Sequence, residues 1–227
     1  MAAPKVLILR PQDVARERVG KLSEQIIQEL IQAEEMDIIG LSQACFLACS
    51  AVNIATKIAN VHVTRIYLDN LEVPILGKFE AIFFTLTKKS GIDFEAEMKR
   101  LDQGLALDRG RDSDVVVIGS RDTPGNMTTI ALWKLSKSKR IKIIAAGAAI
   151  NNAITAALQI THGQISKDPV GILLIALSSI EPRASTGHMN PVSAINIYLE
   201  KGVAKNYDKR HTDTVNELLS KPISFTR

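Results

Sequence analysis

Residues 115–156 decide the fold, and they read VVVIGSRDTPGNMTTIALWKLSKSKRIKIIAAGAAINNAITA. The run Val115–Ile118 is short and apolar, which is typical of a buried strand. Thr123 and Pro124 then supply a capping hydroxyl and a first-turn proline, and these predict the start of a helix. A second apolar run, Ile141–Ala145, is followed by a helical segment rich in small residues. This order of strand, helix, strand and helix defines a unit that we find twice in the chain.

The first half of the chain repeats that order. Val6–Leu9 is a matching apolar run, and apolar residues at three- and four-residue spacing predict a helix from about Asp13 to Ala33. Met36–Ile39 predicts the second strand. Alanines recur at equivalent places in the two small-residue helices: Ala44, Ala48 and Ala51 in the first half, and Ala149, Ala153 and Ala156 in the second.

Two further strands close each half of the chain. The corresponding segments are Ile66–Glu72 with Ile175–Glu181, and Ala81–Leu86 with Ala194–Leu199. In the last strand, apolar residues alternate with Asn196, Tyr198 and Glu200, which predicts one face exposed to water.

The chain is therefore predicted to be an α+β protein. We expect two tandem β-α-β-α-β-β sandwiches, each with a four-stranded mixed sheet and two helices. The expected organisation is a first domain over residues 1–95, a linker with a short helix over 96–112, a second domain over 113–205, and a C-terminal helix or tail over 206–227.

Composition narrows the class of protein. Of 227 residues, 46% are hydrophobic and 23% are charged, which excludes a disordered chain. The two cysteines, Cys45 and Cys49, exclude a disulfide scaffold, and their alignment with Ile150 and Ile154 predicts buried thiols that pack as small hydrophobic groups. The low cysteine count favours a reducing compartment, so we expect a cytoplasmic protein. We expect no membrane span, because no apolar run approaches about 20 residues. The net charge of +4 is concentrated in the second half, which favours an anionic partner.

Two segments of the second half carry a family resemblance. Val115–Arg121 looks like a first strand with its following loop, and Ile143–Ala153 looks like a second strand that enters a second helix. In this order they resemble the Alba family, and the whole chain is similar to an archaeal family of tandem Alba-like proteins. Alba proteins form dimers that bind DNA or RNA. The resemblance therefore implies a nucleic-acid partner and an intramolecular pseudo-dimer, in which the second helices or the last strands meet.

The resemblance also indicates which residues would face a nucleic acid. The loop after the family's first strand carries paired lysines, and here those positions are Ser120 and Arg121. The first half has Pro11 and Gln12 there, with Arg10 beside them. The family's arginine positions at the second helix are uncharged in this chain: Ala146, Ala148 and Asn152 in the second half, and Leu41, Gln43 and Leu47 in the first.

Further cations add to this set of candidates. The densest charge lies where the first helix of the second half ends: Lys134, Lys137, Lys139, Arg140 and Lys142. In a β-α-β unit this end lies at the opposite edge of the sheet from Arg121, so we do not expect one continuous surface. Arg183 and His188 lie in the polar loop Pro182–Pro191, which corresponds to the family's minor-groove hairpin. Each group also has a purely structural interpretation. The residues around Arg121 could simply start a helix, the lysine cluster could stabilise a helix C-terminus, and Pro182–Pro191 could be a polar surface loop.

We therefore hypothesise a non-catalytic protein that binds DNA or RNA with weak sequence specificity and with a steep loss of affinity in salt. The four histidines make no metal-binding spacing, and there is no Gly-x-Ser-x-Gly motif, so we expect no enzyme, metal or cofactor. The alternative hypothesis is a duplicated Alba-like scaffold that has lost nucleic-acid binding and instead binds a protein or a small ligand.

Overall fold

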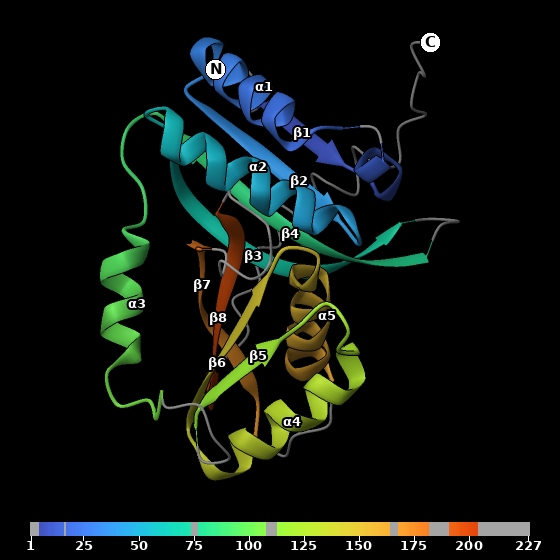
Figure 1. Ribbon diagram of the computed structural model, residues 1–227, viewed down its shortest axis with the longest axis vertical. Coiled ribbons are helices and arrows are strands. Elements are labelled where there is room, and N and C mark those ends of the chain that lie inside the picture. Colours follow the sequence, from blue (N-terminus) through green and yellow to red (C-terminus); the bar gives the residue numbers. More distant parts are fainter. Residues whose placement is uncertain are drawn as a thin grey trace.

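The protein contains two four-stranded mixed sheets, each with a pair of α-helices on one face (Figure 1). The computed structural model describes residues 5–15, 17–73, 77–107, 113–163, 168–181 and 191–203. Within them, sheet A has the strand order β1-β2-β4-β3, and sheet B has the order β5-β6-β8-β7. This architecture confirms the predicted α+β class and the two similar units. The predicted C-terminal helix and the loop Pro182–Pro191 lie largely outside the described residues.

The two sheets are built from equivalent strands. Sheet A contains β1 (Lys5–Leu9), β2 (Glu35–Leu41), β3 (His62–Val73) and β4 (Gly77–Thr87). Sheet B contains β5 (Val115–Ile118), β6 (Arg140–Ala146), β7 (Val170–Ile180) and β8 (Val192–Lys201). In each sheet the first two strands are parallel, and the other pairings are antiparallel.

The helices follow the same repeat. The first half has a 3-10 turn η1 (Pro11–Ala15), α1 (Val19–Gln32) and α2 (Ala44–Ile58). The helix α3 (Phe94–Asp102) joins the halves, and the second half has α4 (Pro124–Lys137) and α5 (Ala149–His162). Ser42 and Gly147, which precede α2 and α5 by two residues, both adopt left-handed backbone, with φ of 49° and 58°. The two halves therefore align residue by residue, with Ala44 equivalent to Ala149 and Ala81 equivalent to Ala194.

The first predicted helix is interrupted, which corrects the single helix expected from Asp13 to Ala33. The carboxylate of Asp13 accepts a hydrogen bond of 2.7 Å from the Arg10 backbone N–H and closes a local turn. Arg18 has extended backbone, so α1 begins only at Val19. Short polar side chains favour such turns because they replace helical hydrogen bonds with local ones.

The halves share one hydrophobic core. Helices α2 and α5 pack against each other, and the buried residues on the helix-covered faces of both sheets form one continuous cluster. Alanines make up much of both helices, and small side chains let packed helices approach closely. The cysteines are buried within this cluster as predicted, and burial raises the pKa of the Cys45 thiol to about 12. The second helices therefore form a contact between the halves, as one of the two expected arrangements requires.

Helix α3 covers sheet B on the face opposite α4 and α5. Its last residue, Asp102, accepts hydrogen bonds of 2.8 Å from the Tyr198 hydroxyl and 3.0 Å from Lys142 Nζ. Asn196, Tyr198 and Glu200 are consequently all buried. The predicted water-exposed face of the last strand is wrong, because the linker between the halves packs on that face.

Replacement of Gly40 by alanine is expected to destabilise the protein by about 1–3 kcal/mol. A Cβ at this position would lie 2.8 Å from the Cβ of Ala48 and 2.9 Å from the Ala44 carbonyl oxygen, where α2 crosses β2. Urea denaturation measures the change. Gly20→Ala is the matched control, since nothing lies within 4 Å of its added methyl group and alanine favours a helix. Equal stability of the two variants would contradict this account.

Candidate nucleic-acid interface

The loop between β5 and α4 presents the first two candidate residues. Ser120 and Arg121 are both exposed. The Asp122 carboxylate accepts a hydrogen bond of 2.7 Å from the Gly119 N–H, and the Asp122 carbonyl accepts one of 2.8 Å from the Asn152 side chain in α5. The first bond closes the loop on itself and the second attaches it to α5, so Arg121 extends from a backbone that is anchored at Asp122.

The start of α4 differs in one respect from the sequence-based expectation. Thr123 is the N-cap residue and Pro124 lies at the first helical position, as predicted. The Thr123 side chain, however, makes no capping hydrogen bond. The first-turn N–H groups of α4 therefore receive no side-chain cap from this residue, and such groups favour an anion.

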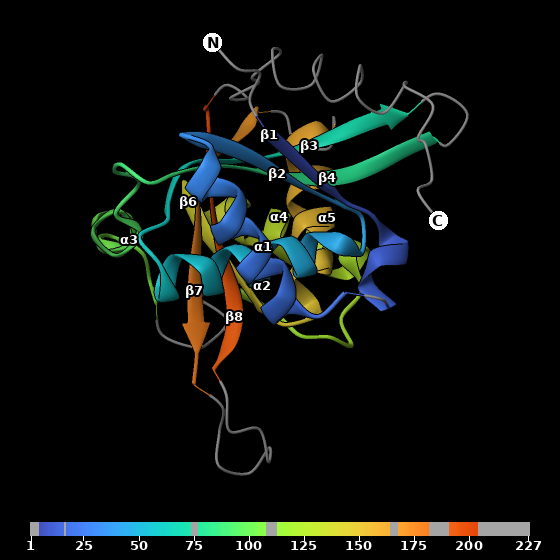
Figure 2. The same cartoon turned by 90° about the horizontal axis from the view of Figure 1, so that it is seen from above.

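Several segments meet at the edge that carries this loop. In α5, Asn152 contacts the loop, and its neighbour Asn151 contacts the start of α2. The Asn151 side chain accepts a hydrogen bond of 2.9 Å from the Phe46 N–H and donates one of 3.1 Å to the Gln43 carbonyl. The turn η1, which follows β1, packs on α2. The loops that correspond to each other in the two halves thus lie along one edge, on the right in Figures 1 and 2. We call this edge the loop edge.

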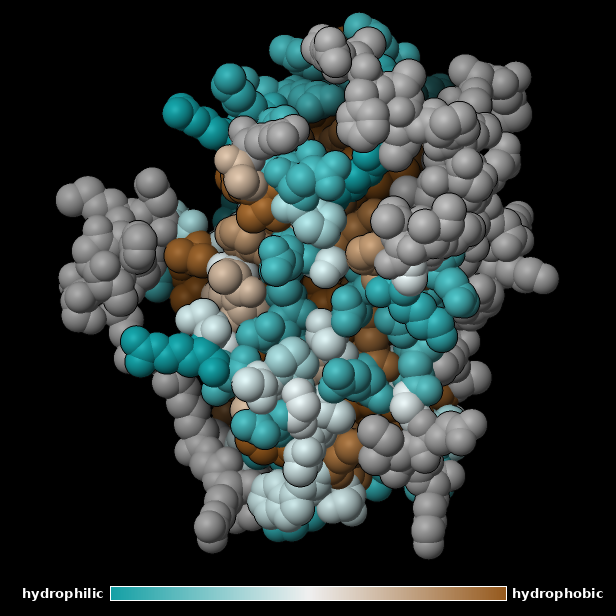
Figure 3. Space-filling view, turned by 90° about the vertical axis from the view of Figure 1, so that its right-hand side faces the viewer, coloured by the Kyte–Doolittle hydropathy of each residue, from teal (hydrophilic) through white to brown (hydrophobic). Residues whose placement is uncertain are grey.

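The loop edge is hydrophilic but carries few cations. Figure 3 views the molecule from this side and shows polar surface with hydrophobic patches between. Gln43 and Ala148, at two of the family's arginine positions, are the N-cap residues of α2 and α5, and both are exposed. Arg10 is half-buried, and its backbone N–H is bonded to Asp13. Arg121 is therefore the one exposed cation among the candidate residues of this edge that the structure describes.

The cations at the end of α4 lie elsewhere and contact the protein itself. Lys134 is buried, and its Nζ donates to the carbonyl of Ser113, which precedes β5. Arg121 follows the other end of β5, so the strand separates this cluster from the loop edge. Lys142 is also buried, with its Nζ 3.0 Å from each carboxylate oxygen of Asp102.

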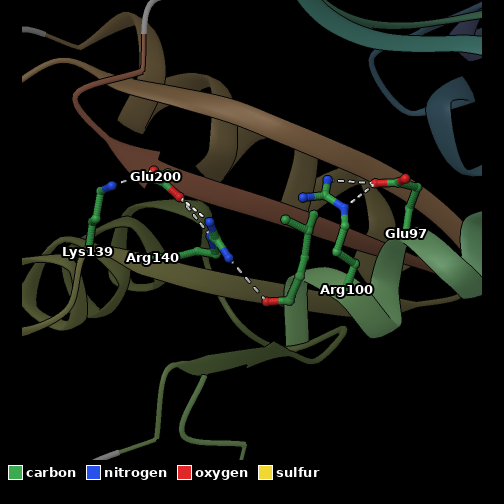
Figure 4. Close-up of polar contacts among 6 residues, drawn as sticks. Glu97, Arg100, Lys139, Arg140 and Glu200 are labelled. Atoms are coloured by element: carbon green, nitrogen blue, oxygen red, sulfur yellow. Dashed lines mark hydrogen bonds and ion pairs between the residues drawn. The ribbon is translucent and has the colours of Figure 1, made fainter. Parts of the chain in front are cut away.

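Glu200 binds two more cations of the cluster (Figure 4). Its carboxylate lies 3.1 Å from Lys139 Nζ and accepts a hydrogen bond of 2.8 Å from Arg140 Nε. Burial alone would raise the pKa of Glu200, but the hydrogen bonds and charges of Arg140 and Lys139 outweigh burial and lower it. Lys137 is exposed, with its Nζ 3.9 Å from the centre of the Trp133 ring. Arg183 and His188 lie outside the described residues.

One pair of titratable residues was not connected by the sequence analysis. His162, at the end of α5, lies with its Nε2 3.2 Å from the Asp69 carboxylate in β3, so the pair spans the two halves. The only signal in the sequence was the alignment of the repeats, in which His162 corresponds to Lys57. That alignment does not indicate Asp69 as the partner of His162. Within the described ranges, no group of three His, Cys, Asp or Glu side chains is arranged to hold a metal ion. No described helix is long and apolar enough to cross a membrane.

The chain is similar to solved structures, among them an Alba protein. No protein-family model matches the chain, and no curated protein matches it. The crystal structure of ALBA1 from Trypanosoma brucei is similar to this chain with 25% sequence identity and a TM-score of 0.33. The match covers 49% of this chain and 85% of that one.

Replacement of Glu200 by glutamine is expected to lower stability by about 1–3 kcal/mol near neutral pH, because Arg140 loses its charged partner. A carboxylate whose pKa is lowered by folding stabilises the protein above its ordinary pKa of 4.5, and that contribution is lost as the pH falls through the lowered value. Thermal unfolding at several pH values should therefore show the difference from wild type shrink in acid. Glu97→Gln, at an exposed pair with Arg100, is the control and should change stability by less than about 1 kcal/mol. A difference that grows in acid would contradict the assignment.

Proposed function

We propose that the chain is a non-catalytic nucleic-acid-binding protein of the cytoplasm, built as an intramolecular pair of Alba-like units that arose by tandem duplication. One observation carries the proposal: the contacts of Asn151 and Asn152 join the starts of α2 and α5 and the β5–α4 loop into one loop edge. These are the segments that the family resemblance assigns to nucleic-acid contact. The linkage within one chain replaces the association of two subunits.

We assign the leading role on this edge to Arg121 and Ser120. Arg121 is exposed beside the start of α4, where a guanidinium and backbone N–H groups can bind one phosphate together. Contacts of this kind bind the backbone and carry no base information, so weak sequence specificity follows. Arg10 adds a half-buried cation from the equivalent loop of the first half.

The remaining candidates have a secondary role in this proposal. Lys134, Lys142, Lys139 and Arg140 contact a carbonyl or carboxylates of the protein, and a phosphate would have to compete with those partners. Lys137 and Lys139 are the exposed members of the cluster, and Lys139 is paired with Glu200. We keep Arg183 and His188, in the loop Pro182–Pro191, as candidate contacts to nucleic acid. Since few phosphates are then neutralised, the expected salt dependence is shallower than the steep loss expected from the sequence.

A second candidate function is supported by the same ion pairs. Asp102 and Glu200 neutralise the cations that would otherwise attract an anionic partner. A duplicated scaffold that binds a protein or a small ligand would retain the fold and use its charges for stability, as seen in this cluster. Absence of nucleic-acid binding at low salt would favour this candidate.

Replacement of Arg121 by glutamine tests the proposed interface. Fluorescence anisotropy with labelled duplex DNA and structured RNA, at about 50 and 200 mM salt, measures affinity and its salt dependence. We expect the variant to bind about tenfold more weakly. The slope of log affinity against log salt should fall by about 0.9, because one phosphate contact is lost.

Lys99→Gln is the matched control, since Lys99 is exposed on α3, away from the loop edge. It should leave both the affinity and the slope unchanged. Equal losses in the two variants would show that only net charge matters. Unchanged binding in the Arg121 variant would overturn the assignment of the loop edge.

A further inference from the structure

The contact between the halves contains two equivalent junctions with different chemistry. In one junction, the second half of α2 packs on the strands β7 and β8, and in the other, α5 packs on β3 and β4. Figure 1 shows the second junction where α5 lies beneath β3 and β4. The register of the strands makes Asn70 equivalent to Ser179 and Glu80 equivalent to Ser193. The helix alignment makes Leu158 equivalent to Asn53.

In the junction of α2, side chains of the helix form hydrogen bonds with the strands. The Asn53 amide nitrogen lies 3.1 Å from the Ser178 carbonyl, 3.1 Å from Ser179 Oγ and 3.1 Å from Ser193 Oγ. Asn53 is buried, and Lys57 Nζ one turn later also donates to Ser179 Oγ. Nitrogen donors from the helix thus satisfy the acceptors of the strands.

The junction of α5 has the acceptors but not these donors. Leu158 replaces the asparagine, and His162 replaces the lysine and bonds Asp69 at 3.2 Å. A hollow of about 340 Å³ lies between helix and strands. Its lining includes Asn70, Glu80, Thr155, Leu158, Gln159 and His162. Within the described part of the chain, no side-chain donor bonds the amide oxygen of Asn70 or the carboxylate of Glu80.

We propose that this hollow binds a small organic cation that carries a guanidinium or primary amine group. The nitrogen of the ligand would take the place that the Asn53 amide occupies in the other junction, and it would donate to Asn70 and Glu80. The carboxylate of Glu80 selects a cation over a neutral amide, because only a cation adds the attraction of opposite charges to the hydrogen bond. The volume is at the lower end of the range for small-molecule sites.

This site differs from the proposed nucleic-acid interface in charge, although the two lie close together, since the Glu80 carbonyl accepts a hydrogen bond of 2.7 Å from the Ser42 N–H just before α2. It is formed by the end of α5 and the strands β3 and β4, whereas the loop edge involves the starts of α2 and α5. Glu80 and the nearby Asp69 are acidic and would repel a phosphate. Binding of the cation therefore does not depend on whether the protein binds DNA or RNA.

Isothermal titration calorimetry with agmatine tests the proposal, with butylurea as an uncharged probe of similar shape. We expect agmatine to bind with a dissociation constant of about 0.1–1 mM, and butylurea to bind at least about tenfold more weakly. Two variants remove the site differently. Glu80→Gln removes the charge and keeps the shape, and Leu158→Asn supplies the amide that closes the other junction.

Both variants should weaken agmatine binding by about tenfold or more, and Glu97→Gln, on exposed α3, should bind as wild type does. Thermal unfolding checks that each variant is folded. If Leu158→Asn is unfolded, Glu80→Gln alone tests whether agmatine binds in the hollow. No agmatine binding up to about 10 mM, equal binding of butylurea, or unchanged binding in Glu80→Gln would each overturn the proposal.

Discussion

The packing of α2 against α5 is the constraint on which the rest of the structure depends. Each sheet has an apolar face that its own two helices cover only in part, and the shared core extends from one half into the other through these helices. Small side chains let α2 and α5 approach closely. The Asn151 side chain of α5 fixes how the two helices are aligned, because it forms hydrogen bonds with the backbone of Gln43 and Phe46. The loop edge, the junctions with β3–β4 and β7–β8, and the acidic hollow all follow from this one contact.

Four cations near the end of α4, namely Lys134, Lys139, Arg140 and Lys142, contact oxygen atoms of the protein itself. Lys142 and Tyr198 bond Asp102, and burial together with that carboxylate raises the pKa of Tyr198, so the hydroxyl stays protonated. Arg140 and Lys139 converge on Glu200. Helix α3 thereby attaches the linker to sheet B. Among the described residues, basic composition therefore does not translate fully into basic surface, because Lys134 and Lys142 are buried.

The sequence predicted what local patterns determine. Apolar periodicity and the repeat located every strand of both sheets, although β3 and β7 begin earlier than predicted, at His62 and Val170, and Pro124 marked the start of α4. The interruption before α1 depends on the Asp13 side chain, which competes with helical hydrogen bonds. Burial of Tyr198 and the pairing of Lys142 depend on where α3 packs, and a one-dimensional pattern holds no such information. For the candidate site, the sequence identified the exposed Arg121, but it did not show which lysines already have partners.

The loop edge also has a direction. A twofold-symmetric dimer presents the same groups at both ends of such an edge, and a duplex lying along it can bind in either orientation. Here the β5–α4 loop carries Arg121, whereas the equivalent turn η1 carries Gln12. The two ends of the edge are therefore chemically different. A single strand bound along it would have one preferred polarity, and neighbouring molecules on that strand would all face the same way, whereas the antiparallel strands of a duplex would still admit both orientations.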